Sequence, residues 1–196
     1  GYAPKYAETS LTTQELAPAR RAIEFILRQQ EPYPAFVMDR YWNVLMTNDA
    51  LPRIFGKVRG RAPLHGNVLH QIFDPNDMRP VVANWADVAS DVIRHLHHQI
   101  AAAPSDTKAR SLLDEVLKYP DVPVEWRTRE PGRSPSPLLT TTFRNDAMEL
   151  RFLSTFTTFG TTWNVTIEEL RIESMFPADE PTGADCRSLA PESPAT

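Results

Sequence analysis

One long stripe of apolar side chains at helical spacing constrains the fold more than any other feature of the sequence. The stripe runs from residue 81 to residue 100, and Pro80 stands where a proline suits the first turn of a helix. Its members are Val81, Val82, Trp85, Val88, Ala89, Val92, Ile93, Leu96 and Ile100. The spacing therefore predicts a long amphipathic helix with one buried face.

Two short segments with β-strand composition precede this helix and predict a hairpin. They are residues 35–39 and 42–48, and the first ends at a turn-favouring aspartate, Asp39. Asn48 ends the second segment, and its side-chain oxygen can accept a hydrogen bond from the first turn of a following short helix. Strand therefore gives way to helix at Asn48.

Three further strands are predicted after the long helix, where the apolar period changes from helical spacing to alternation. These segments are rich in Thr, Phe and β-branched residues, and they cover residues 138–143, 149–159 and 165–176. In the last of them, alternation predicts that Arg171 and Glu173 face outward. The residues expected to face the core are Leu170, Ile172, Ser174 and Phe176.

Helical spacing predicts three more helices. They cover residues 12–30, 67–73 and 105–119, the first opening with a capping box of Thr12 and Glu15. Residues 183–196 are mostly Ala, Pro, Ser and Thr, which predicts a disordered tail that contains the single cysteine, Cys186. We therefore expect an N-terminal linker helix in residues 1–31, one globular domain in 32–182 and a tail in 183–196.

The charge balance argues against direct DNA binding by this chain. The formal net charge is −4, so the protein lacks the positive field that attracts a phosphate backbone. The nearest basic patch comprises Arg53, Lys57, Arg59 and Arg61, which we interpret as a solvated loop, with phosphate contact as the alternative. No apolar run is long enough to span a bilayer, and a lone cysteine suits a reducing cytosol. The opening Gly1 suggests a fragment of a longer, cytoplasmic protein.

Two strands, several helices and three more strands form the layout of a PAS domain, an α+β fold. We therefore expect one curved, antiparallel, five-stranded sheet covered by helices inserted after the second strand. Several stretches carry a more specific resemblance: Phe73-Asp74-Pro75, Asn84-Trp85 with Ala89 and Arg94 beyond, the run from Phe152 to Gly160, and the run from Leu170 to Asp179. Across about residues 32–182 the chain resembles the ligand-binding domain of MmyB-like transcription regulators.

This resemblance implies a function as well as a fold. In that family the PAS-like domain follows an Xre-type helix-turn-helix, and the regulators are cytoplasmic and usually dimeric. The resemblance implies a homodimer that binds a small apolar effector, of fatty-acid type, and meets DNA only through a domain missing from this chain. No membrane partner is implied.

The candidate ligand-binding residues lie on the strands and helices that would enclose a pocket. They are Met38, Trp42, Phe73, Trp85, Val88, Val92, Arg94, Phe152 and Phe156. The simpler interpretation of each apolar member is core packing. Arg94 could hold a carboxylate head group through two parallel hydrogen bonds, or it could form a surface ion pair.

Other functions have weaker support in the sequence. His95, His97 and His98 form a histidine cluster, but no two are four residues apart, which argues for a solvated helical face over a metal site. We find no nucleophile beside a base, so we expect no catalytic residues, no cofactor and no enzyme activity. The main alternative is a constitutive PAS-type dimerisation module, with a solid core and no ligand, whose opening helix pairs with a second copy.

Overall fold

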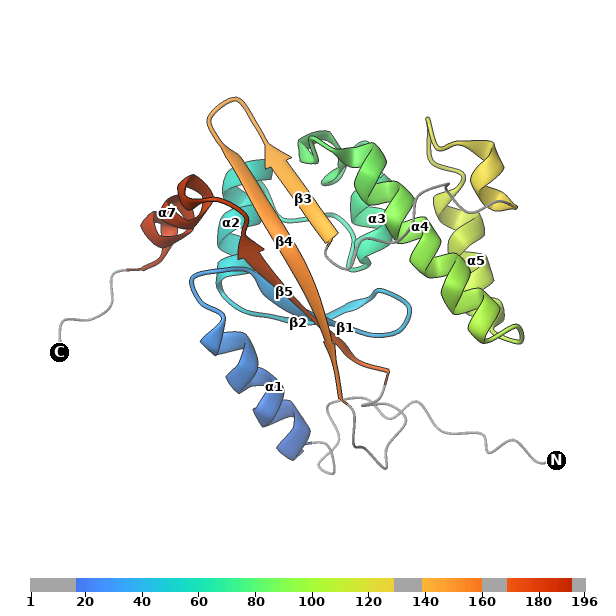
Figure 1. Cartoon of the computed structure of the whole chain (residues 1–196), viewed down its shortest axis with the longest axis horizontal. Coiled ribbons are helices and arrows are strands. Elements are labelled where there is room, and N and C mark those ends of the chain that lie inside the picture. The colour runs from blue at the N-terminus through green and yellow to red at the C-terminus, as the bar shows by residue number, and fades with distance from the viewer. Residues whose placement is uncertain (1–16, 129–138, 160–168, 192–196) are drawn as a thin grey trace.

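The computed structural model describes residues 17–128, 139–159 and 169–191, and they form one five-stranded antiparallel sheet with associated helices (Figure 1). The strand order is β2-β1-β5-β4-β3. The strands are β1 (Ala35–Met38), β2 (Val44–Thr47), β3 (Leu139–Arg144), β4 (Glu149–Thr158) and β5 (Arg171–Pro177). Two strands precede the inserted helices and three follow them, so the predicted PAS-like α+β arrangement is confirmed.

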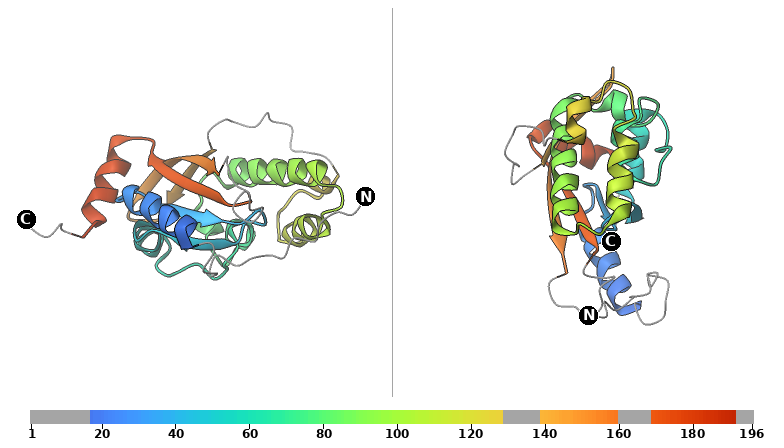
Figure 2. Two further views of the ribbon diagram at one scale, coloured as in Figure 1. Left: turned by 90° about the horizontal axis from the view of Figure 1, so that it is seen from below. Right: turned by 90° about the vertical axis from the view of Figure 1, so that its right-hand side faces the viewer.

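The helices between β2 and β3 pack on one face of the sheet and build the main core. They are α2 (Ala50–Arg59), α3 (Val68–Phe73), α4 (Trp85–Ala102) and α5 (Thr107–Val116), with short 3-10 helices η2 (Arg79–Val81) and η3 (Val124–Arg127). The predicted stripe is therefore divided, since its first two residues fall in or after η2. The second view of Figure 2 shows α4 and α5 side by side at one end of the molecule. Side-chain caps fix two helix starts: Asn67 accepts from the Leu69 N–H, and Asp106 accepts from those of Lys108 and Ala109.

The other face of the sheet is covered by α1 (Ala17–Gln29). Ile23 and Leu27 of this helix pack in a second apolar cluster with Ala35, Val37, Leu170 and Ile172. All four residues of β1 are buried because the strand is covered on both sides. The capping box predicted at Thr12 and Glu15 lies outside the described residues.

This second cluster overturns the predicted orientation of β5. Val37 pairs with Ile172, and Phe36 pairs with Glu173, so Ile172 faces α1 while Glu173 shares the other face with Phe36. Glu173 is 7% exposed and Phe176 is 41% exposed, the reverse of the expectation. The predicted alternation of side chains was correct. However, both faces of the sheet are covered by helices here, so neither set of alternating residues has to face solvent.

A helix occupies half of the segment that composition predicted to be a disordered tail. This helix, α7 (Glu180–Leu189), begins at Asp179, whose side chain accepts from the Thr182 N–H. The Thr182 hydroxyl in turn accepts from the Arg151 N–H of β4. Cys186 lies on the buried side of this helix, and burial raises the pKa of its thiol to about 11. Few apolar residues suffice here because the helix needs to cover only one edge of an existing core.

Asn48 joins α1, β1 and α2 at a buried junction. Its side-chain oxygen accepts from the N–H groups of Ala35 and Leu51, and its amide nitrogen donates to the Tyr33 and Leu27 carbonyls. The predicted cap of the following helix is therefore confirmed, as one of several bonds.

Replacing Asn48 with alanine will lower the free energy of unfolding by about 2 kcal/mol, because two N–H groups and two carbonyls would each lose a hydrogen bond at a buried position. Urea unfolding followed by circular dichroism measures the loss. The neighbouring Asp49→Ala variant is the control, since Asp49 is exposed and its side chain caps no N–H. Equal stability of the two variants would show that the Asn48 bonds contribute nothing net.

Candidate functional site

A cavity of about 320 Å³ lies between the sheet and the helices inserted after β2. This volume is in the range of small-molecule sites, which start at about 300 Å³. Most of the wall is apolar and comes from β1, β2, α2, α3, α4, β3 and β5. The lining residues are Phe36, Trp42, Val44, Thr47, Leu51, Pro52, Phe55, Pro63, His65, Gly66, Val68, Gln71, Ile72, Met78, Val82, Val88, Val92, Thr141, Phe143, Glu173 and Met175.

Trp42 is held in the cavity wall by the backbone of the β1-β2 turn. Its φ of +67° is uncommon for a bulky residue, and hydrogen bonds on both sides keep it there. The Trp42 N–H donates to the Asp39 carbonyl, and the Trp42 carbonyl accepts from the Val68 N–H. The ring is 3% exposed, and its Nε1 has no acceptor among the described residues.

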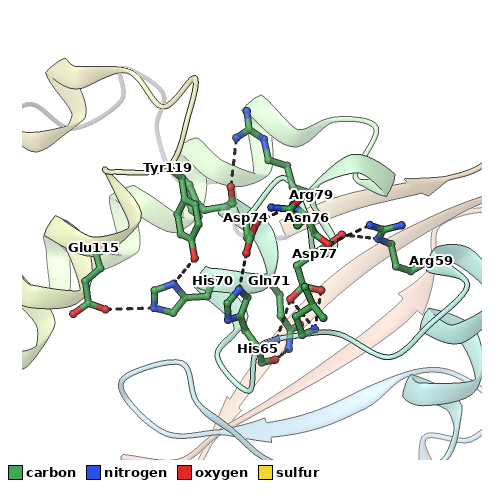
Figure 3. Close-up of polar contacts among 12 residues, drawn as sticks. Arg59, His65, His70, Gln71, Asp74, Asn76, Asp77, Arg79, Glu115 and Tyr119 are labelled. Atoms are coloured by element: carbon green, nitrogen blue, oxygen red, sulfur yellow. Dashed lines mark hydrogen bonds and ion pairs between the residues drawn. The ribbon is translucent and has the colours of Figure 1, made fainter.

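The loop between α2 and α3, which supplies Pro63, His65 and Gly66 to the wall, is tied down by buried Asp77 (Figure 3). The Asp77 carboxylate accepts from the N–H groups of Leu64 and His65 at 3.0 to 3.1 Å. From α3, the Gln71 side chain donates to the His65 carbonyl at 2.7 Å. This wall is therefore fixed by polar contacts that need no ligand.

His65 of this loop and His70 of α3 form further polar contacts around the cavity wall (Figure 3). The His65 ring lies 2.8 Å from an Asp74 oxygen, and this hydrogen bond lowers the pKa of Asp74. His70 lies between the Tyr119 hydroxyl at 2.9 Å and Glu115 at 3.4 Å, which links α3 to α5. Within the described ranges, no group of three or more His, Cys, Asp or Glu side chains could hold a metal ion. These contacts have the geometry of structural bridges.

Three of the residues predicted to bind ligand line the cavity: Trp42, Val88 and Val92. Phe156, which is 37% exposed, lines a neighbouring hollow of about 390 Å³ that shares Trp42 as a wall. The last residue of α3 and two strand residues are fully buried in the core and do not line the cavity: Phe73, Met38 and Phe152.

Trp85 packs beside the cavity without lining it. Its indole N–H donates to the Ile72 carbonyl at 2.8 Å, its ring meets Phe73 edge to face, and the Arg79 guanidinium lies 3.9 Å from the ring centre. These contacts occupy both the polar and the apolar parts of the side chain. Trp85 therefore supports the wall formed by Ile72.

Arg94 and the histidine cluster lie outside the cavity wall. Arg94 is 2% exposed and forms an ion pair with Asp91, so the predicted ion pair exists, although it is buried. His95 contacts the Asp91 carbonyl and His97 contacts the Trp126 carbonyl. His95 and His98 both line the neighbouring hollow, whereas His97 does not.

Glu173 is the one site residue that sequence reasoning placed on the wrong side. Its carboxyl lines the apolar cavity, and burial raises its pKa to about 7, an effect that the Ser154 hydroxyl of β4 partly opposes. A signal was available in the sequence. If an amphipathic α1 packs on the sheet, the Leu170 and Ile172 side of β5 must face it, and Glu173 must then face the inserted helices.

The family model described as "MmyB-like transcription regulator ligand binding domain" matches residues 19–189. The chain belongs to the MmyB-like ligand-binding domain family. The match confirms the resemblance seen in the sequence and includes the segment that folds as α7. No curated protein matches the chain. None of the helices in the described segments is long and apolar enough to cross a bilayer.

The family is one of ligand-binding domains, and the cavity has a composition that suits a small-molecule site. Small-molecule sites are concave, and the cavity is lined mainly by apolar and aromatic side chains with a few polar groups. In this MmyB-like domain, those polar groups are Thr47, His65, Gln71, Thr141 and Glu173.

Proposed function

We propose that this domain senses a small apolar effector in the 320 Å³ cavity and controls a DNA-binding domain outside residues 1–196. The mainly apolar cavity between the sheet and the inserted helices carries the proposal, and membership of a family of regulatory ligand-binding domains supports it. Trp42, Val88 and Val92 are the effector contacts common to the sequence prediction and the cavity wall. The domain acts in the cytoplasm, without catalysis and without a cofactor.

The effector acts by binding two arrangements of the domain with different affinity. Such coupling typically amounts to about 1 to 3 kcal/mol, enough to change DNA occupancy several-fold. The family resemblance favours a homodimer with an Xre-type helix-turn-helix and an effector of fatty-acid type. Phe25 and Ile26 support dimerisation through α1, because they are 56% and 37% exposed on that helix.

The cavity weighs against the alternative of a constitutive dimerisation module. That alternative expects a solid interior, and close-packed interiors contain few voids larger than a water molecule. A volume of about 320 Å³ is equivalent to roughly ten water-sized groups. Space of this size beside buried valines is better explained by an occupant.

Filling the cavity will abolish this binding. The double substitution Val88→Phe/Val92→Phe places two rings, one helical turn apart on α4, into the space that the effector would use. We expect the Kd for 1-octanol, measured by isothermal titration calorimetry, to rise at least tenfold. Native mass spectrometry of wild-type protein should also detect a retained small molecule that the double variant lacks.

The matched control is Val124→Phe, because Val124 is 82% exposed in η3 and does not line the cavity. Its affinity for 1-octanol should equal that of the wild type. Thermal unfolding verifies that the double variant is folded at the titration temperature. A folded double variant that binds 1-octanol as well as the control would refute the cavity as the effector site.

A further inference from the structure

The charged groups of the cavity wall indicate which polar head group an otherwise apolar effector could carry. Of the described lining residues, His65 and Glu173 are the titratable ones, and none is Lys or Arg. His65 already pairs with Asp74 at 2.8 Å. The other ionisable group of the wall is therefore the Glu173 carboxyl. Among the described lining residues, a carboxylate ligand would find no positively charged partner except His65, which is already paired with Asp74.

Glu173 lies on the central strand of the sheet and is 7% exposed. Its cross-strand neighbours are Phe36 on β1 and Phe156 on β4, and side chains directly opposite one another share a face. Among the described residues no Arg, Lys or His forms an ion pair with Glu173, and the nearby hydroxyl of Ser154 is its polar neighbour. Such a carboxyl is costly to ionise unless a ligand supplies a donor or a positive charge.

A second polar atom of the wall also lacks a partner. Trp42 is 3% exposed, lines the cavity, and its buried indole N–H donates to no acceptor in the described part of the chain. A purely hydrocarbon effector would leave both groups unsatisfied. A hydroxyl head could donate to Glu173 and accept from the Trp42 N–H, whereas an ammonium head could donate to Glu173 alone. The wall therefore indicates an amphiphile that brings polar atoms into the cavity.

We propose that the effector is an amphiphile whose polar end donates a hydrogen bond to the Glu173 carboxyl, as an amine or an alcohol does, and that the cavity rejects a carboxylate head. This inference rests on the proposed function, because it assumes that the cavity is the effector site. A carboxylate head beside Glu173 would place two like charges together away from water, whereas an ammonium head would pair with it. The head group thus differs from the fatty-acid type that family resemblance implies.

Three probes of equal chain length test the inference: octylamine, 1-octanol and octanoate, titrated by calorimetry at pH 8. We expect octylamine and 1-octanol to bind at least tenfold more tightly than octanoate. In Glu173→Gln the difference should shrink to less than threefold, since glutamine carries no charge. The control Glu125→Gln, at an exposed position of η3, should behave as the wild type.

The pH provides a second readout. Because the pKa of Glu173 is about 7, the affinity for octylamine should rise between pH 6 and pH 8, and Glu173→Gln should show no such rise. An alkylamine stays protonated throughout this range. The other charged or titratable groups around Glu173 are His65 at the wall, His95 on α4 and Arg171 on β5. Any rise that persists in Glu173→Gln would come from them.

The outcomes separate the two proposals. If no octyl compound binds, the cavity is not the effector site and the proposed function fails. If all three bind and octanoate is as tight as octylamine in the wild type, the sensing role stands and the head-group inference is overturned. A preference for octylamine that survives in Glu173→Gln overturns it as well.

Discussion

Replacing Phe73 with alanine will lower the free energy of unfolding by about 4 kcal/mol, in the usual range for losing a buried aromatic ring. Phe73 is fully buried at the end of α3 and meets Trp85 edge to face, with ring centres 6.0 Å apart. Removing the ring leaves a void between α3 and α4 that rigid helices close poorly. Urea unfolding at pH 7 measures the loss, and Phe25→Ala on α1 is the control, because Phe25 is 56% exposed.

The same variant distinguishes core from ligand contact. Phe73 was a candidate ligand-binding residue by sequence, yet it does not line the cavity. The Kd for 1-octanol should therefore change by less than threefold at a temperature where the variant is folded. A large loss of affinity for 1-octanol with little loss of stability would instead show that Phe73 contacts the ligand.

The sequence predicted the fold through signals that are local. The α4 stripe depends on side-chain periodicity, and the helix start at Asn48 depends on a side chain that reaches the next turn. The hairpin of β1 and β2 likewise needs only neighbouring residues. These local predictions hold in the folded protein because the tertiary contacts favour the same helices and strands.

Contacts between distant elements could not be obtained in the same way. Whether Phe73, Met38 or Val92 faces the cavity depends on how α3, α4 and the sheet stack, and core and lining positions use the same residue types. The loop wall at His65 depends on Asp77, a buried carboxylate that no local pattern singles out. Glu173 was misplaced because its orientation follows from α1, a helix far away in the chain.

Glu173→Gln will stabilise the protein at pH 8 by about 3 kcal/mol, because it removes a carboxylate that is buried in an apolar wall. Folding raises the pKa of Glu173 from an ordinary value of 4.5 to about 7. Its proton is therefore held more tightly in the folded state. The wild type keeps the associated stability below pH 4.5 and loses it as the pH rises through 7.

The difference in stability between the wild type and Glu173→Gln should accordingly vanish near pH 4.5 and reach its full size at pH 8. Urea unfolding across this range measures it, and taking the difference cancels the titration of all other groups. Glu125→Gln should track the wild type at every pH. A gap that is independent of pH would mean that the Glu173 carboxyl is solvated in the folded protein.

A bound ammonium group should reduce this difference in stability between the wild type and Glu173→Gln. It binds the folded protein and favours the ionised carboxylate, so saturating octylamine at pH 8 should stabilise the wild type more than Glu173→Gln. Octanoate should not distinguish the two proteins in this direction, because its charge opposes that of Glu173. Burying the Glu173 carboxylate lowers the stability of the folded protein at pH 8. An effector that donates a hydrogen bond or a positive charge to this carboxylate is therefore expected to restore that stability, and an effector without such a donor is not.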